Sequence, residues 1–272
     1  MAEVEVNGVR LHYREAGSGA QTVVFSHSFL ADHRQFDAQI EVLSRTCRVI
    51  AYDHRDHGRS GRVDASYDLD ALVGDAEALL DALSVDQCDF VGLSTGGFVG
   101  MRLALRSPER FRSLTLMDTS AEPEPRGQRR RYRALLAVLG IAGIRPVLRS
   151  GMTAMFSRSF LRDPGRQDEV DLWRRRIAGN DARGLIRFGN AIFARDDVVD
   201  RLRKLAVPTL VIVGEHDRPC PPERARTIAA AIPDARLVVI PGAGHLSTIE
   251  QPEAVNDALV PFIHDHLPKG AR

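Results

Sequence analysis

Short apolar, β-branched runs alternate along the chain with segments that repeat apolar residues at helical spacing. Runs that are apolar on both faces are typical of buried parallel strands. The sequence predicts such strands at residues 22–26, 47–52, 90–92, 114–117, 209–213 and 237–240. Between residues 69 and 83, apolar residues recur every three or four positions, which predicts a helix with one buried face. Further helices are expected after Pro221 and Pro222 and near residues 253–266.

Repeated strand–helix units predict an α/β fold, in which a mostly parallel, twisted sheet carries helices on both faces. This rhythm stops between residues 122 and 204, where helical segments occur around 132–139 and 177–193 without a convincing strand pattern. We therefore expect a core formed by residues 1–121 and 205–272, with a helical cap at 122–204 inserted between them.

Charge separates the same two parts of the chain. Residues 122–204 hold 19 Arg and Lys against 10 Asp and Glu, net +9, whereas the remaining residues hold 18 against 26, net −8. The expected cap and core are therefore electrostatically complementary. The whole chain of 272 residues has a net charge of only +1, which gives no indication of a nucleic-acid or membrane partner.

The composition, with 44% hydrophobic and 27% charged residues, is typical of a soluble globular protein. Cys47, Cys88 and Cys220 show no C-x-x-C spacing, so neither a disulfide framework nor a thiolate zinc site is expected. The sequence shows no basic leader followed by an apolar stretch and no run of 18 apolar residues. We expect a cytoplasmic protein; a homodimer is one of the oligomeric states left open.

A G-x-S-x-G sequence at residues 92–96 follows a predicted strand directly and precedes an apolar helical pattern. A sharp strand-to-helix turn exposes the central serine, and the flanking glycines remove side chains that would clash. Ser94 is therefore a candidate nucleophile. A serine hydroxyl needs a base to take its proton, and that base needs a carboxylate to orient it.

Asp217 and His245 follow the last two predicted strands and supply this carboxylate and this base, in the chain order Ser, Asp, His. Asp118, at the end of the strand at 114–117, is an alternative acid. His27 and His54 are expected to be structural, since neither follows the last strand.

These motifs resemble the α/β-hydrolase family over nearly the full chain. Residues 214–217 and 242–245 are similar to the acid and histidine loops of that family, and residues 53–60 resemble its D-x-R-G-x-G-x-S turn, with Asp56 in place of a glycine. The resemblance implies an acyl-enzyme hydrolase that needs no cofactor and whose oxyanion donors are the backbone N–H groups of Phe29 and Thr95.

Ser28 stands where the family usually has the glycine of a His-Gly loop. The resulting Ser-x-Ser resembles the loop of enol-lactone hydrolases, which favours a small-molecule ester, lactone or enol-lactone as the substrate. Alternatively, Ser28 simply fits the turn and has no role in substrate choice.

The candidate substrate contacts are Ser28, Trp173, Phe156 and Leu246. Because a helical cap on this fold lies across the carboxyl ends of the strands, apolar cap residues are expected to form a lid over Ser94. Arg174 is a candidate partner for a substrate carboxylate or part of a solvated helix face.

Other chemistries stay open. Residues 52–57 match three of four positions of the H-x-H-x-D-H pattern of zinc lactonases, but Tyr52 replaces the first histidine, so we expect no metal. Cofactor-free haloperoxidase or perhydrolase chemistry and carbon–carbon bond hydrolysis use the same three side chains. A ligand-binding protein of the same fold without turnover is a further alternative.

Overall fold

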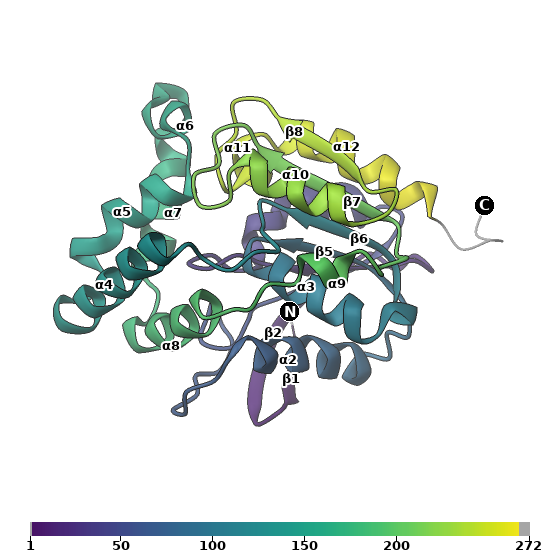
Figure 1. Ribbon diagram of the computed structural model, residues 1–272, viewed down its shortest axis with the longest axis horizontal. Coiled ribbons are helices and arrows are strands. Elements are labelled where there is room, and N and C mark those ends of the chain that lie inside the picture. The colour runs from purple at the N-terminus through teal and green to yellow at the C-terminus, as the bar shows by residue number, and fades with distance from the viewer. Residues whose placement is uncertain (1, 267–272) are drawn as a thin grey trace.

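The computed structural model describes residues 2–266 and contains an eight-stranded sheet with helices on both faces (Figure 1). The strand order is β1-β2-β4-β3-β5-β6-β7-β8. The β1–β2 and β2–β4 pairs are antiparallel and the other pairs are parallel. The strands are β1 (Ala2–Val6), β2 (Val9–Ala16), β3 (Thr22–Ser26), β4 (Arg48–Tyr52), β5 (Cys88–Leu93), β6 (Phe111–Met117), β7 (Thr209–Gly214) and β8 (Arg236–Ile240). Each predicted strand is present, and the predicted α/β fold is confirmed.

Two hydrophobic layers separate this sheet from its helices. Outside the segment between β6 and β7, the helices are η1 (His33–Phe36), α1 (Asp37–Leu43), α2 (Leu69–Ala82), α3 (Thr95–Arg106), η2 (Pro108–Arg110), α10 (Pro222–Ala231), α11 (Ser247–Glu250) and α12 (Pro252–Asp265). Helices α2, α3 and α10 share one layer with Ile50 and Phe90, and α1 and α12 share the other with Val49 and Val91. Neighbouring strand residues thus enter opposite layers, which explains why these runs are apolar at consecutive positions.

The antiparallel strands β1 and β2 form a hairpin that the sequence prediction missed. Asn7 and Gly8 make its turn with φ of 47° and 72°, the left-handed values that an Asn-Gly pair favours. Val6, Val9 and Leu11 beside the turn are buried. The sequence feature that could have predicted this hairpin is therefore the Asn-Gly pair, which lies between segments of alternating apolar residues.

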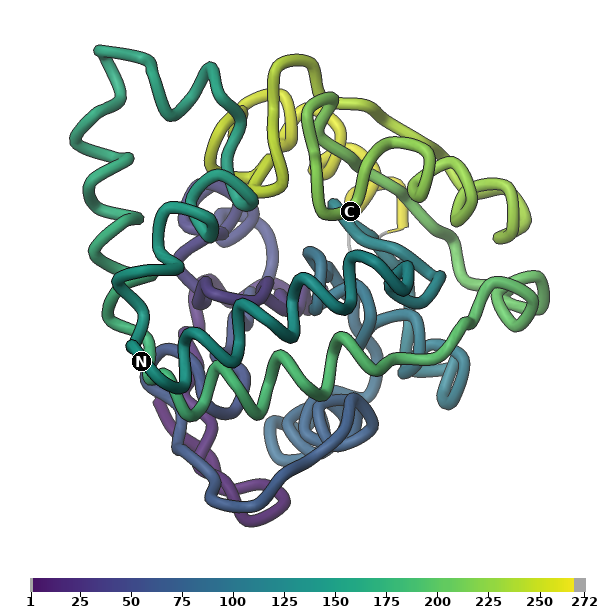
Figure 2. Tube along the Cα trace, turned by 60° about the vertical axis from the view of Figure 1, so that its left-hand side comes forward, coloured from purple at the N-terminus to yellow at the C-terminus, as the bar shows by residue number. Residues whose placement is uncertain are grey.

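Between β6 and β7 the chain forms helices only, and we call α4 to α8 the cap. The helices of this segment are α4 (Arg126–Ala142), α5 (Arg145–Met155), α6 (Arg158–Arg162), η3 (Pro164–Arg166), α7 (Gln167–Ala178), α8 (Ala182–Phe193) and α9 (Val199–Leu202). Figure 2 shows α4 and α8 lying side by side. The helical segment expected at 177–193 is two helices, because the Asp181 side chain accepts from the Gly184 N–H (2.7 Å) and begins α8 separately. Within residues 2–266, no helix has the length and hydropathy that a bilayer crossing requires.

Asp56 fastens the cap to the sheet at the turn where the family pattern has glycine. Its φ of 63° is a value that suits glycine. Arg187 of α8 donates from Nη2 to Oδ1 (2.7 Å) and from Nε to Oδ2 (3.1 Å), and the Tyr67 hydroxyl donates to Oδ2 (2.8 Å). Burial acts to raise the pKa of this carboxyl, but the donors from Arg187 and Tyr67 bring it below its ordinary value. Aspartate in place of glycine at this position therefore also provides the carboxylate that binds the cap through Arg187.

We expect Arg187→Met to lower the free energy of unfolding by about 3 kcal/mol, because it leaves the buried Asp56 carboxylate without its cation. Asp56→Gly is expected to lower it by only about 1 kcal/mol, because glycine suits the positive φ and the freed guanidinium is able to reach water. Urea unfolding of both variants measures the difference. A larger loss for Asp56→Gly than for Arg187→Met would contradict this account of the pair.

Candidate active site

Ser94 lies in the tight turn between β5 and α3, with a φ of 54° that non-glycine residues rarely adopt. The turn needs glycine on both sides. A Cβ on Gly92 would lie 2.2 Å from the Gly96 carbonyl oxygen, and a Cβ on Gly96 would lie 1.9 Å from the Ser26 carbonyl oxygen. The Ser94 N–H donates to the Met117 carbonyl (2.8 Å), which ties the turn to β6. The serine is thus presented at the carboxyl end of β5 by a backbone with no room to relax.

His245 and Asp217 form a buried hydrogen-bonded pair on the loops after β8 and β7. His245 Nδ1 lies 2.9 Å from both Oδ1 and Oδ2 of Asp217, and Asp217 Oδ1 also accepts from the Cys220 N–H (2.9 Å). Because an ionised carboxylate only accepts, Nδ1 carries the proton in this pair, and Nε2 keeps a lone pair. His245 and Ser94 both line one cavity, so the structure places the three predicted side chains in one region.

Asp118, the alternative acid, supports Asp217 from the end of β6. Its Oδ1 accepts from the Gly214 N–H (2.7 Å) and its Oδ2 from the Ser247 hydroxyl (2.5 Å). Burial and the neighbouring Asp217 charge raise the pKa of Asp118 well above its ordinary value. The pKa of Asp217 is also raised by burial, but less strongly, so Asp118 is the carboxyl of the two that binds a proton more readily. The carboxylate that contacts His245 Nδ1 is that of Asp217.

The pKa of the His245 imidazole is raised above its ordinary value of 6.5. Burial acts to lower this pKa, but the charge of Asp217 and its hydrogen bond outweigh that effect. The buried imidazole is consequently a stronger base than a free one.

The loop after β3 carries the two residues predicted beside the oxyanion position, Ser28 and Phe29. The Ser28 hydroxyl (2.8 Å) and its N–H (3.2 Å) both donate to Gln35 Oε1, which holds the loop. The Phe29 N–H has no acceptor within residues 2–266, and the Thr95 N–H begins α3 and has none within the helix. Both N–H groups are thus available as donors. Ser28, predicted as a substrate contact, is buried and is not among the residues that line the cavity, and its side chain holds the loop through Gln35.

His27 and His54 support the same loop. The His54 N–H donates to His27 Nε2 (2.9 Å), so His27 carries its proton on Nδ1 and donates it to the Ser28 carbonyl (2.8 Å). Burial lowers the pKa of both imidazoles, which keeps them neutral. These two histidines are structural, as the sequence predicts.

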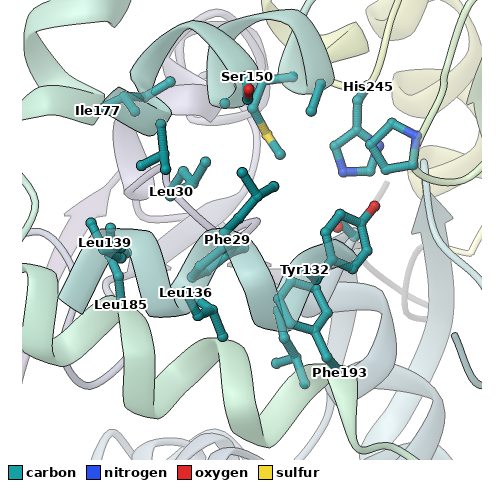
Figure 3. Close-up of a pocket in the computed structure, with 18 of the residues that line it drawn as sticks. Phe29, Leu30, Tyr132, Leu136, Leu139, Ser150, Ile177, Leu185, Phe193 and His245 are labelled. Atoms are coloured by element: carbon teal, nitrogen blue, oxygen red, sulfur yellow. The ribbon is translucent and has the colours of Figure 1, made fainter. Parts of the chain in front are cut away.

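A cavity of about 120 Å³ is lined by Ser94, His245 and the cap (Figure 3). Most of its wall is apolar and comes from α4, α5, α7 and α8 and from the loop that carries Phe29. The lining residues with polar side-chain atoms are Ser94, Glu124, Tyr132, Ser150, Cys220 and His245. None of the described residues that line the cavity is Lys, Arg or Asp.

A second pocket of about 450 Å³ adjoins the cavity. The residues that line both are Tyr132, Leu135, Ser150, Ala154 and Pro219. Arg131 and Arg218, which are exposed to solvent, line only the second pocket. The cavity and the second pocket therefore share a wall at Tyr132 and Pro219, and the positively charged Arg131 and Arg218 line the second pocket.

Trp173, Phe156 and Leu246, which we predicted as substrate contacts, do not line the cavity. All three lie in the hydrophobic core; Trp173 is 3% and Phe156 1% exposed. The cause is packing within the cap, where the ring of Phe156 stacks on that of Phe160 (4.8 Å) and lies 6.4 Å from that of Trp173. Met155, next to Phe156 in sequence, is a cap residue that lines the cavity instead.

Arg174 does not face the cavity either. Its side chain is 50% exposed on α7 and forms an ion pair with Asp171, so it belongs to a solvated helix face. The cavity residues Glu124 and Tyr132 were not among the predicted site residues. Tyr132 begins a predicted helical segment, but helical spacing alone does not say which neighbour a side chain meets.

In residues 52–57, which resemble the zinc-lactonase pattern, the carboxylates of Asp53 and Asp56 do not point to one common site. Asp56 binds Arg187 of the cap, whereas Asp53 Oδ1 accepts from both Nδ1 (2.8 Å) and N–H (2.9 Å) of His33. Potential ligand atoms of His12, His33 and Asp53 lie within 4.8 Å of one another. The Asp53 carboxylate in this group is already held by hydrogen bonds to His33.

Three comparisons with known proteins agree with this arrangement. The model of the alpha/beta hydrolase fold family matches residues 21–252. 3-Oxoadipate enol-lactonase 2 of Acinetobacter baylyi is 30% identical over 252 residues, which cover 92% of each chain. The solved enol-lactonase of Burkholderia xenovorans superposes with a TM-score of 0.91 at 29% identity, over 97% of this chain and 100% of that one. A thermophilic esterase of Thermogutta terrifontis has a TM-score of 0.91 at 28% identity, with coverage of 98% and 99%.

We predict that the His245 imidazole titrates above pH 6.5, and that Asp217→Asn brings its pKa below 6.5 because burial then acts unopposed. Asp118→Asn is the matched control. Since Asp118 bonds to the Gly214 N–H and the Ser247 hydroxyl and not to the imidazole, its replacement should change the pKa of His245 less. Side-chain NMR over a pH series measures these values, with His245→Gln assigning the resonance. Equal shifts in the two Asn variants would contradict the placement of the negative charge on Asp217.

Proposed function

The chain belongs to the α/β-hydrolase fold family, and we propose that it is a serine hydrolase that cleaves a small, neutral carboxylic ester or lactone. The observation that carries this proposal is the His245–Asp217 hydrogen bond beside a cavity that Ser94 also lines. A base with a fixed tautomer and a serine on a strained turn are the parts that acyl transfer needs. The relatives named enol-lactonase and esterase support the same class of reaction.

Acylation in this proposal begins at His245. Its Nε2 takes the proton of the Ser94 hydroxyl while the serine oxygen attacks the carbonyl carbon of the substrate. The N–H groups of Phe29 and Thr95 donate to the oxyanion that forms. Asp217 stabilises the imidazolium through Nδ1, and His245 then gives its proton to the leaving alcohol.

Deacylation repeats the sequence with water. His245 takes a proton from the water molecule, the hydroxide attacks the acyl carbon, and the carbonyl–Ser94 bond breaks as the serine oxygen regains a proton. The products are the free acid and the original enzyme. The proposed chemistry uses only these side chains, the two backbone donors and water.

The cavity favours a short, uncharged acyl group. Its volume of about 120 Å³ is below the roughly 150 Å³ of an engineered apolar cavity that holds benzene. A carboxylate buried in an apolar wall needs a cation or several donors, and no Lys or Arg is among the described lining residues. 3-Oxoadipate enol-lactone, the compound in the name of one relative, carries a carboxylate that this cavity is poorly suited to hold.

Hydrolysis of 4-nitrophenyl hexanoate tests the proposed reaction. We expect measurable turnover by the wild-type protein and a loss of kcat by about 10⁴-fold or more in Ser94→Ala, because the nucleophile and base act as a unit. Stopped assays on γ-lactones extend the test to cyclic esters. Turnover that persists in Ser94→Ala would contradict a serine mechanism.

A matched pair of aryl esters tests the neutral acyl group. We expect kcat/KM for 4-nitrophenyl hexanoate to exceed that for the 4-nitrophenyl monoester of adipic acid by at least about 10-fold, because the second substrate buries a carboxylate. The two acyl chains have six carbons each, so length does not differ. A preference for the acidic ester would refute the neutral class while leaving the serine mechanism intact.

A further inference from the structure

Residues 126–162 of the cap form a segment without acidic residues, which spans α4, α5 and α6. The segment also has no Lys, and its nine arginines are Arg126, Arg129, Arg130, Arg131, Arg133, Arg145, Arg149, Arg158 and Arg162. Within residues 2–266 none of these side chains forms an ion pair, whereas Arg174, later in the cap, pairs with Asp171. Nine positive charges without counter-charges indicate an anionic partner outside this chain, which the net charge of +1 for the whole chain conceals.

Helix α4 has two different faces. One contains Leu136 and Leu139, which are buried and line the cavity. The other is exposed to solvent, and we define the α4 face by the residues that follow one another on it at helical spacing, which are Arg130, Ala134, Ala137, Val138 and Ile141. The α4 face is therefore positively charged at its beginning and apolar over the roughly two turns that follow.

The α4 face exposes apolar side chains of a kind that the rest of the fold covers. Ile141 is 89% and Val138 41% exposed, and within the described part of the chain Leu172 is the only other large apolar residue that is exposed. Ile141 and Val138 are neighbours on one helix instead of being scattered, and a contiguous exposed apolar patch is typical of an interaction surface. Helices α4 and α5 lie at the edge of the molecule, away from the sheet, where an extended surface has access to them (Figure 1).

The charges and the apolar residues together select the kind of partner. A symmetric dimer through the α4 face would bring two sets of unpaired arginines together, which disfavours a second copy of the chain. The phosphates of a nucleic acid would pair with the arginines but leave Ile141 in water. An anionic phospholipid surface offers negative headgroups and, directly below them, an apolar layer for Ile141 and Val138.

We propose that the α4 face docks on an anionic phospholipid surface. Val138 and Ile141 enter the boundary between headgroups and acyl chains, and the arginines at the two ends of the apolar stretch contact headgroup phosphates. These arginines are Arg130 on α4 and Arg145, which begins α5 four residues after Ile141. The inference goes beyond the proposed hydrolysis and does not depend on it, because no residue of the α4 face lines the cavity.

Co-sedimentation of the full chain with lipid vesicles tests the docking. We expect binding to vesicles of phosphatidylglycerol and phosphatidylcholine in equal parts, weakened by added NaCl, and at least about 10-fold weaker binding to phosphatidylcholine alone. Ile141→Gln should weaken binding to the anionic vesicles by about 10-fold, because an apolar side chain no longer leaves water. The double variant Arg130→Gln, Arg145→Gln should weaken it by about 30-fold, because two headgroup contacts are lost.

The double variant Arg45→Gln, Arg236→Gln is the matched control. It removes the same number of charges from exposed positions outside the cap, so binding should fall by less than about threefold. Circular dichroism shows whether each variant is folded. Absence of wild-type binding to the anionic vesicles would overturn the inference and leave the α4 face to an acidic protein. Equal weakening in the two double variants, or unchanged binding in Ile141→Gln, would also overturn it. None of these results bears on ester hydrolysis, which is measured without vesicles.

Discussion

The hydrogen bond between His245 Nδ1 and Asp217 joins the loops after β8 and β7, and the arrangement of the site depends on it. Beside this pair, Asp118 at the end of β6 accepts from the Gly214 N–H at the end of β7 and from the Ser247 hydroxyl after β8. The carboxyl ends of three adjacent strands are thereby connected through buried hydrogen bonds. A buried carboxylate is stable only where donors surround it. The network therefore sets both the charge on Asp217 and the orientation of the imidazole toward the cavity.

Two contacts that use charged groups illustrate how the cap is held against the rest of the chain. At one, Asp56 binds Arg187 of α8. At the other, the Glu250 carboxylate accepts from the Ser157 N–H (3.1 Å), and Arg166 donates to the Glu250 carbonyl (2.6 Å), only five residues after His245. The opposite net charges of residues 122–204 and of the rest of the chain agree with such a contact. We propose on these grounds that residues 122–204 act as one lid whose position sets the size of the cavity.

The core of the fold was predictable because buried parallel strands and the glycines around Ser94 are local features. A Cβ at Gly96 has no space beside Ser26, so the tight turn between β5 and α3 requires glycine there, and the G-x-S-x-G motif predicts the turn. The β1–β2 hairpin was missed although Asn7 and Gly8 mark its turn, because its strands are apolar on one face only. The substrate contacts were not predictable, since Trp173 is apolar and helical like Met155, and only the packing of the cap decides which of them meets the cavity.

Covalent labelling with diethyl 4-nitrophenyl phosphate tests most directly whether His245 activates Ser94. The phosphorus of this reagent accepts an activated serine oxygen and releases 4-nitrophenol. The account predicts one equivalent of 4-nitrophenol per chain, a diethylphosphoryl group found by peptide mass spectrometry on Ser94, and labelling slowed at least about 100-fold in His245→Ala. A label on another residue, or unchanged labelling of Ser94 without His245, would contradict it.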